Sequence, residues 1–175
     1  MFHAITKPPA RLSVRKQRIF DFLSSFQSGV LSSVTSEGEP HASVIYYFVD
    51  PELFQIFFLT KNGTQKYDNL VHNNQVVFVV YDAETQKVAH VYGQAYEIID
   101  ARSVNEVASR IYRQKLQTGK AAVLPISRLQ AGAYTAFTIV PSQIHLASFS
   151  QPKSGDYEHM FESIESFDLH PTLEN

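Results

Sequence analysis

The sequence contains no cysteine and no tryptophan in 175 residues, and its acidic and basic residues nearly balance. Without cysteine the chain has no disulfide, no thiolate metal ligand and no cysteine nucleophile. The formal net charge of -2 at pH 7 gives no general basic excess, so we expect neither nucleic acid nor an anionic membrane as a partner.

Long hydrophobic runs are also missing. No stretch reaches the roughly 18 consecutive apolar residues that a membrane-spanning helix needs. The N-terminal segment MFHAITKPPARLSVRKQR lacks the apolar core of a signal peptide. We therefore expect a cytoplasmic protein that does not span a membrane.

Aromatic residues are plentiful, at 13% of a composition that is 44% hydrophobic. Such a chain can bury a substantial core, and its length suits a single domain over residues 1–175. Pro8 and Pro9 disfavour regular structure in an N-terminal arm over residues 1–12. Residues 151–175 form a polar, acidic C-terminal tail.

Short stretches with strand character, separated by turn residues, fill most of the chain. Their connections are mainly too short for parallel crossovers, which favours antiparallel pairing. An apolar stripe predicts a helix over 14–26, and a capping-box pattern at Ser103 and Glu106 begins another. The sequence predicts a mainly β fold, a small closed antiparallel barrel with flanking helices. The six predicted strands are 30–35, 41–49, 53–59, 75–81, 87–99 and 134–145.

Two residues predict irregularities within these strands. Gly93 interrupts the fifth strand and indicates a bulge or bend. Pro141 lies inside the sixth strand and cannot donate a ladder hydrogen bond. We therefore expect an edge or a break in the pairing at that position.

A polar turn follows the third predicted strand, in the segment FFLTKNGTQKYDNL. Its Asn-Gly pair permits a tight turn with positive φ, and a helix-like segment starts near Thr64. Helix N-terminal amides, the hydroxyls of Thr60 and Thr64, and the ammonium groups of Lys61 and Lys66 are the fixed donors and charges that a phosphate requires. The alternative interpretation is a solvated hairpin tip in which Thr64 only caps the helix.

Three features in order along the chain carry a family resemblance. They are the hairpin EGEPHAS at 37–43, the strand end Thr60 followed by Thr64-Gln65-Lys66, and the tripeptide Gly93-Gln94-Ala95. Together they resemble the FMN-binding split-barrel family typified by pyridoxamine 5'-phosphate oxidase. The resemblance covers residues 29–99, with a weaker match at 133–147.

The resemblance implies a six-stranded antiparallel split β-barrel that binds FMN between the two chains of a homodimer. The strand at 43–46 would run along the isoalloxazine ring, and the turn at 60–66 would hold the phosphate. The apolar third and fourth strands also favour a dimer, because they exceed what one barrel interior needs to bury. The implied cofactor-binding residues are Ser43, Val44, Ile45, Tyr46, Thr60, Lys61, Thr64, Gln65 and Lys66.

The sequence departs from the oxidase that names the family at three cationic positions. Ser43 and Gln65 stand where that enzyme has arginine, and Phe48 stands where it has lysine. The C-terminal tryptophan and arginine elements of that enzyme also have no match. These differences argue against pyridoxamine phosphate as the substrate.

The leading functional hypothesis is an FMN-dependent oxidoreductase that acts on a small-molecule substrate or electron donor. The alternatives are a non-enzymatic flavin-binding or sensing protein, a haem-binding or haem-degrading relative, and a deazaflavin-dependent reductase on the same barrel. Tyr46, Tyr47 and Tyr92 could stack on the ring or could be ordinary core residues. The seven histidines show no metal-ligand spacing, so no metal site is expected.

Overall fold

The computed structural model describes residues 14–117, 132–149 and 163–168. The predicted N-terminal arm and most of the predicted tail lie outside these residues. The elements are α1 (Val14–Ser24), β1 (Ser28–Val34), β2 (Pro40–Val49), β3 (Ile56–Lys61), α2 (Gln65–His72), β4 (Gln75–Asp82), β5 (Lys87–Ile98), α3 (Ala101–Gln117), β6 (Tyr134–Ser148) and β7 (Ser163–Asp168).

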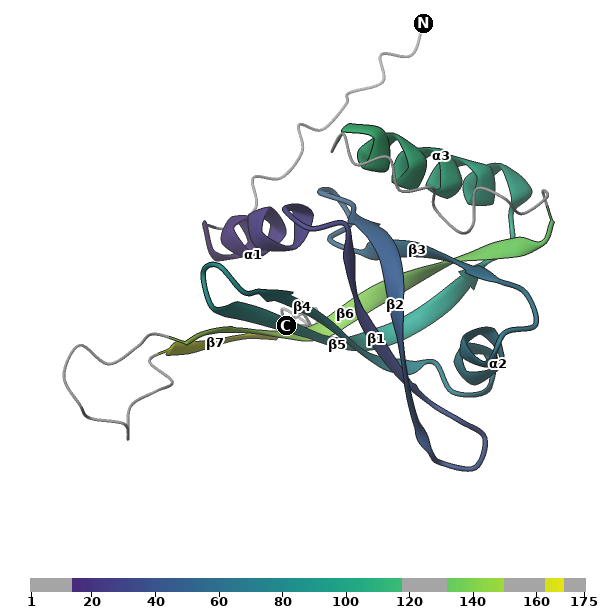
Figure 1. Ribbon diagram of the computed structural model, residues 1–175, viewed down its shortest axis with the longest axis horizontal. Helices are drawn as coiled ribbons and strands as arrows, with labels where there is room; N and C mark the ends of the chain where they lie inside the picture. The colour runs from purple at the N-terminus through teal and green to yellow at the C-terminus, as the bar shows by residue number, and fades with distance from the viewer. Residues whose placement is uncertain (1–13, 118–131, 150–162, 169–175) are drawn as a thin grey trace, which may run out of the picture.

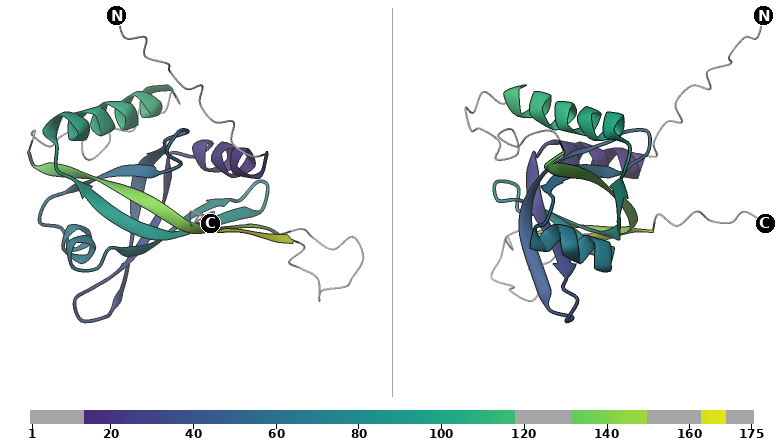
Figure 2. Two further views of the ribbon diagram at one scale, coloured as in Figure 1. Left: turned by 180° about the vertical axis from the view of Figure 1, so that it is seen from behind. Right: turned by 90° about the vertical axis from the view of Figure 1, so that its right-hand side faces the viewer.

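Six antiparallel strands close into a barrel (Figures 1 and 2). The strand order is β3-β2-β1-β4-β5-β6, and β3 pairs with β6 from Ile56↔Ile139 to Lys61↔Tyr134, which completes the ring. The predicted mainly β, six-stranded antiparallel barrel with flanking helices is therefore confirmed. A seventh strand, β7, pairs with the far end of β6 outside the ring, where the sequence predicted only a polar tail.

The prediction for the start of β3 was wrong, because Leu53 belongs to a turn over residues 51–53, residues 54–55 lie outside regular structure, and the strand begins at Ile56. The Asp50 side chain accepts hydrogen bonds from the N–H groups of Glu52 and Leu53, at 3.0 Å each. Leu53 is 61% exposed, whereas Phe54 adopts φ 54° and buries its ring in the core. The apolar run continues through the turn because one turn residue packs inward, and periodicity alone does not reveal this.

Helix α1 closes one end of the barrel. Its buried residues Ile19 and Leu23 pack on the core, as the predicted apolar stripe requires. The hydroxyl of buried Tyr47 donates to the Leu23 carbonyl at 2.5 Å, which satisfies one of the last carbonyls of the helix. Burial raises the pKa of Tyr47 above its ordinary value, so this phenol stays a neutral donor.

Helix α3 covers part of the outside of the barrel. Val107 and Ile111 pack with Phe48, Leu59 and Ala136 in a second apolar cluster. The outer face of β3, for which the sequence suggested a partner chain as cover, is thus covered within the same chain. Exposed apolar side chains remain on other strands, among them Val30 of β1 and Val44 of β2.

One ion pair fastens α3 to the end of β2. The Arg110 guanidinium lies 4.1 Å above the Phe48 ring and pairs with Asp50 at 3.0 Å. Phe48 also stacks on Phe57 of β3, with 5.1 Å between the ring centroids. These contacts hold the helix over the strand pair and keep the Phe48 side chain on the α3 side.

The predicted irregularity at Gly93 is confirmed. The β5–β6 register shifts between Tyr92 and Gly93, and Gly93 faces Pro141. A Cβ at Gly93 would lie 2.4 Å from the Val140 carbonyl oxygen, so only glycine fits without backbone movement. Residues 134–139 of β6 pair with β3 and residues 143–148 pair with β7, so Pro141 lies between the two paired segments. The break in the pairing that the sequence predicted therefore falls at this position.

We predict that Gly93→Ala lowers the free energy of unfolding by about 2–3 kcal/mol, because the new methyl group meets backbone atoms that cannot rotate away. Gly38→Ala is the control, since nothing lies within 4 Å of a Cβ there and only its φ of +85° is unfavourable. That variant should lose about 1 kcal/mol. Urea unfolding measures both, and an equal loss in the two variants would refute the steric explanation.

Candidate functional site

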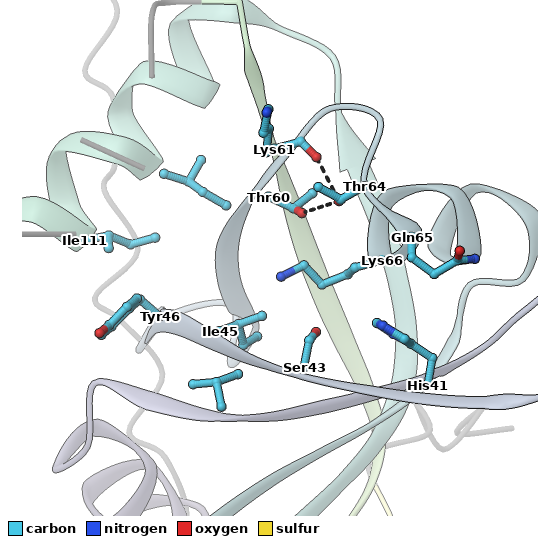
Figure 3. A pocket seen from close by; sticks show the side chains of 12 residues that line it. His41, Ser43, Ile45, Tyr46, Thr60, Lys61, Thr64, Gln65, Lys66 and Ile111 are labelled. Atoms are coloured by element: carbon cyan, nitrogen blue, oxygen red, sulfur yellow. Dashed lines mark hydrogen bonds between the residues drawn. The ribbon is translucent and has the colours of Figure 1, made fainter. Parts of the chain in front are cut away.

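The barrel is split along one edge of β2. The first part of β2, Pro40 to Tyr46, pairs with β1, but β3 pairs only with Tyr47 to Val49. One backbone edge of the first part is therefore open. The end of β3, the following turn and the start of α2 lie opposite this open edge (Figure 3).

The pairing pattern shows which backbone groups face the split. The Tyr47 N–H donates to the Gln27 carbonyl on the β1 side at 3.1 Å. Because backbone groups alternate in direction along a strand, Ala42, Val44 and Tyr46 direct their N–H and C=O groups toward the split. The strand thus presents a row of alternating donors and acceptors to any molecule that enters.

A cavity of about 540 Å³ occupies the split. This volume lies within the range of sites for small molecules and cofactors. The structure brings all nine residues of the sequence prediction to its walls and adds three that the sequence did not indicate. The lining residues are His41, Ser43, Val44, Ile45, Tyr46, Leu59, Thr60, Lys61, Thr64, Gln65, Lys66 and Ile111.

The turn after β3 forms one end of the cavity. Gly63 adopts φ +66°, as expected for a tight turn, and Thr64 caps helix α2 by accepting from the Tyr67 N–H. The Thr64 hydroxyl donates to the Lys61 carbonyl at 2.9 Å and lies 3.3 Å from the hydroxyl oxygen of buried Thr60. Thr64 is therefore a helix cap as well as a cavity residue.

Lys66 is the cation that points into the cavity (Figure 3). Burial lowers the pKa of its amine, which shows that water is partly removed from this charge. Among the residues that the structure describes, no carboxylate pairs with Lys66. A partly buried cation without a counter-ion favours the binding of an anion.

Two other polar residues that line this end of the cavity, Lys61 and Gln65, are less involved. Lys61 is exposed, so water screens its charge. The Gln65 side chain donates to the Asn69 side chain at 2.8 Å, one turn along α2, and Asn69 donates to the Ser33 hydroxyl of β1 at 3.1 Å. Asn69 and Ser33 are buried, so this chain of bonds fixes α2, and with it Lys66, against the sheet.

Two polar atoms on β2 are buried at the cavity without a partner in the described part of the chain. They are Nδ1 of His41 and the hydroxyl oxygen of Ser43. Both side chains project from β2 into the cavity, on the side that faces α2 (Figure 3). Buried polar groups are normally hydrogen-bonded, so their state here fits a site that is completed by a polar ligand.

The opposite end of the cavity is apolar. Leu59 of β3, Ile111 of α3 and Tyr46 of β2 line it. The sequence prediction missed Ile111 because α3 lies far along the chain and only packing brings it here. Its apolar helical periodicity indicated a buried face but not what that face covers.

The other two candidate tyrosines are placed elsewhere. Tyr47 is a core residue and does not line the cavity, while the Tyr92 ring lies 5.1 Å from the His145 ring on another part of the sheet. Within residues 14–117, 132–149 and 163–168, no group of three or more potential metal ligands occurs. No helix in the same ranges is long and apolar enough to cross a membrane.

We predict that Lys66→Met raises the free energy of unfolding of the ligand-free protein by about 1 kcal/mol, because it removes a desolvated charge and keeps the apolar stem. Lys61→Met, which changes an exposed charge, should have an effect near zero. Urea unfolding in buffer without phosphate measures both. A destabilised Lys66→Met variant would show that the amine already has an internal partner.

Comparison with known proteins identifies the family of this chain. The sequence model of the pyridoxamine 5'-phosphate oxidase family matches residues 16–147, more than half of the chain. No sequence among the curated proteins matches significantly.

Solved structures with the same fold support the assignment. A conserved hypothetical protein from Mycobacterium tuberculosis has a TM-score of 0.65 at 19% identity, with 87% of this chain and 99% of that chain covered. A heme binding protein from Mycobacterium smegmatis has a TM-score of 0.62 at 15% identity, with 90% and 59% covered. An FAD binding protein from Mycobacterium smegmatis has a TM-score of 0.52 at 21% identity, with 81% and 98% covered. At these identities the structures establish the shared fold, and together with the sequence match they show that this chain belongs to the pyridoxamine 5'-phosphate oxidase family.

Proposed function

We propose that the cavity binds FMN and that the protein is a homodimeric FMN-dependent oxidoreductase. The observation that carries this proposal is the partly buried amine of Lys66, which pairs with no carboxylate in the described part of the chain and lies beside an open strand edge. The amine suits a phosphate, and the strand edge suits a flat heterocycle with hydrogen-bonding groups along one side. Bound FMN would supply the redox chemistry, while the protein positions it and controls access.

The phosphate would bind at the N-terminus of α2. The Tyr67 N–H donates to the Thr64 side chain and the Asp68 N–H to the Thr64 carbonyl, which leaves the N–H groups of Gln65 and Lys66 without partners inside the helix. These two amides and the Lys66 amine form a set of donors at one end of the cavity, next to the buried Thr60 hydroxyl. Helix N-terminal amides and a lysine together stabilise a phosphate.

The isoalloxazine ring would lie along β2. Its pyrimidine edge carries alternating donors and acceptors, which match the backbone groups of Ala42, Val44 and Tyr46. The apolar wall formed by Leu59 and Ile111 suits the rest of the ring. In this arrangement the chain orients the ring by backbone contacts and excludes water from one side of it.

The dimer would form through the outer face of β2, β1 and β4. Val44 and Val79 are the register partners of Val30 on either side, so the three side chains form one row across the sheet. Val44 is 66% exposed and Val30 39% exposed. Because Val44 also lines the cavity, a second chain on this row would border the bound cofactor.

The substrate would differ from pyridoxamine phosphate. Phe48, at a position where the name-giving oxidase has lysine, is held against Arg110 and does not line the cavity. Gln65, where that enzyme has arginine, donates its side-chain amide to Asn69. These positions therefore supply no charge for a second phosphate.

Haem is the second candidate ligand. Nδ1 of His41, which has no hydrogen-bond partner among the described residues, could ligate iron in the cavity, and a structural neighbour is a heme binding protein. FAD is a further flavin to compare, because another neighbour is an FAD binding protein. Absorption spectra of the protein titrated with each compound distinguish them.

We predict that FMN binds with micromolar or better affinity and that Lys66→Ala weakens binding about 10–100-fold, the effect of losing one charge-assisted hydrogen bond. Lys61→Ala, at the exposed lysine of the same turn, should change affinity less than about threefold. Quenching of flavin fluorescence measures both. No FMN binding, or a haem spectrum in preference to a flavin spectrum, would refute the proposal.

Anaerobic mixing of the FMN complex with NADH or NADPH then separates an oxidoreductase, whose flavin is reduced rapidly, from a flavin sensor, whose flavin is not.

We also predict that Val30→Asp converts a dimer into a monomer, because it places a charge at the centre of the proposed interface. Ile99→Asp, at a residue that is 91% exposed, is the control and should leave the dimer intact. Sedimentation should give about twice the chain mass of 19.8 kDa for the parent and the control. A monomeric parent with FMN bound would contradict the interface.

A further inference from the structure

His41 is a cavity residue that neither the sequence pattern nor the family resemblance assigns to the site. It lies on β2 two residues before Ser43, and both side chains face the cavity (Figure 3). Its Nδ1 is buried and has no hydrogen-bond partner among the described residues. A buried ring nitrogen in this state loses its contact with water and gains nothing in return, unless a ligand provides the partner.

The surroundings of His41 place it at the α2 end of the cavity. His41 pairs across the sheet with Ser33, and the Ser33 hydroxyl accepts a hydrogen bond from Asn69 of α2 at 3.1 Å. Asn69 and Lys66 are three residues apart and so share one face of the helix. His41 and Lys66 therefore enter the same end of the cavity from two facing elements, and Ile111 lines the other end.

We propose that His41 is a phosphate ligand, which together with Lys66 and Ser43 makes this end of the cavity selective for a flavin that carries a terminal phosphate monoester. This inference rests on the proposed binding of flavin. A phosphate monoester has two negative charges and three terminal oxygens, enough for the Lys66 amine, the His41 ring and the Ser43 hydroxyl at once. The Asn69–Ser33 contact positions the helix, while His41 contacts the ligand.

The test compares FMN with riboflavin, which has the same ring and ribityl chain but no phosphate. His41→Ala should weaken FMN binding about 10-fold, as expected for the loss of one charge-assisted bond, and should change riboflavin binding less than about twofold. His41→Lys should restore most of the FMN affinity by returning a hydrogen-bond donor for the phosphate. The control is His72→Ala, at an exposed histidine in the last turn of α2, the helix that carries Lys66. This variant should bind both flavins as the parent does.

The outcomes separate this inference from the proposed function. A parent protein that binds neither flavin refutes the proposed function itself. A parent that binds FMN, with His41→Ala binding it equally well, overturns only the role of His41. An equal loss of FMN and riboflavin in His41→Ala also overturns it, because the imidazole would then act on the ring or on the fold. Melting temperatures of all variants show whether the fold is retained.

Discussion

The incomplete pairing of β2 with β3 is the constraint on which the rest of this structure depends. The ring closes through β3 and β6, so the barrel keeps its core although β2 leaves β3 after three register pairs. Among the strands that the structure describes, only β1 pairs with the half of β2 that separates. Its other edge must be satisfied by water or a ligand, because exposed strand edges retain their hydrogen-bonding capacity. The cavity is a direct result of this arrangement.

The elements around the split fix the positions of the side chains that line the cavity. Helix α2 is tied to β1 through Asn69 and Ser33, which fixes the position of the partly buried Lys66 amine. Helix α3 is tied to β2 by Arg110 and Asp50 and adds an apolar wall at the other end. One end therefore favours an anion and the other an apolar ring system, which is the division of properties found in a phosphorylated heterocycle.

The sequence predicted the barrel and the turn residues that line the cavity because both depend on local patterns. Strand character, the Asn-Gly turn and the Thr64 cap are encoded within a few residues, and the order of Thr60, Thr64 and Lys66 follows from the strand-turn-helix sequence. Contacts between distant segments were not accessible in this way. Ile111 reaches the cavity through helix packing, and His41 is distinguished only by its unpartnered nitrogen. The role of Asn69 likewise depends on the approach of α2 to β1.

The central claim is that the split holds FMN with its phosphate at Lys66. A crystal structure of the protein grown with FMN tests it most directly. We expect phosphate density within hydrogen-bonding distance of the Lys66 amine and a flavin ring along the backbone of Ala42 to Tyr46. Density for FMN at another surface, with only solvent between β2 and α2, would contradict it.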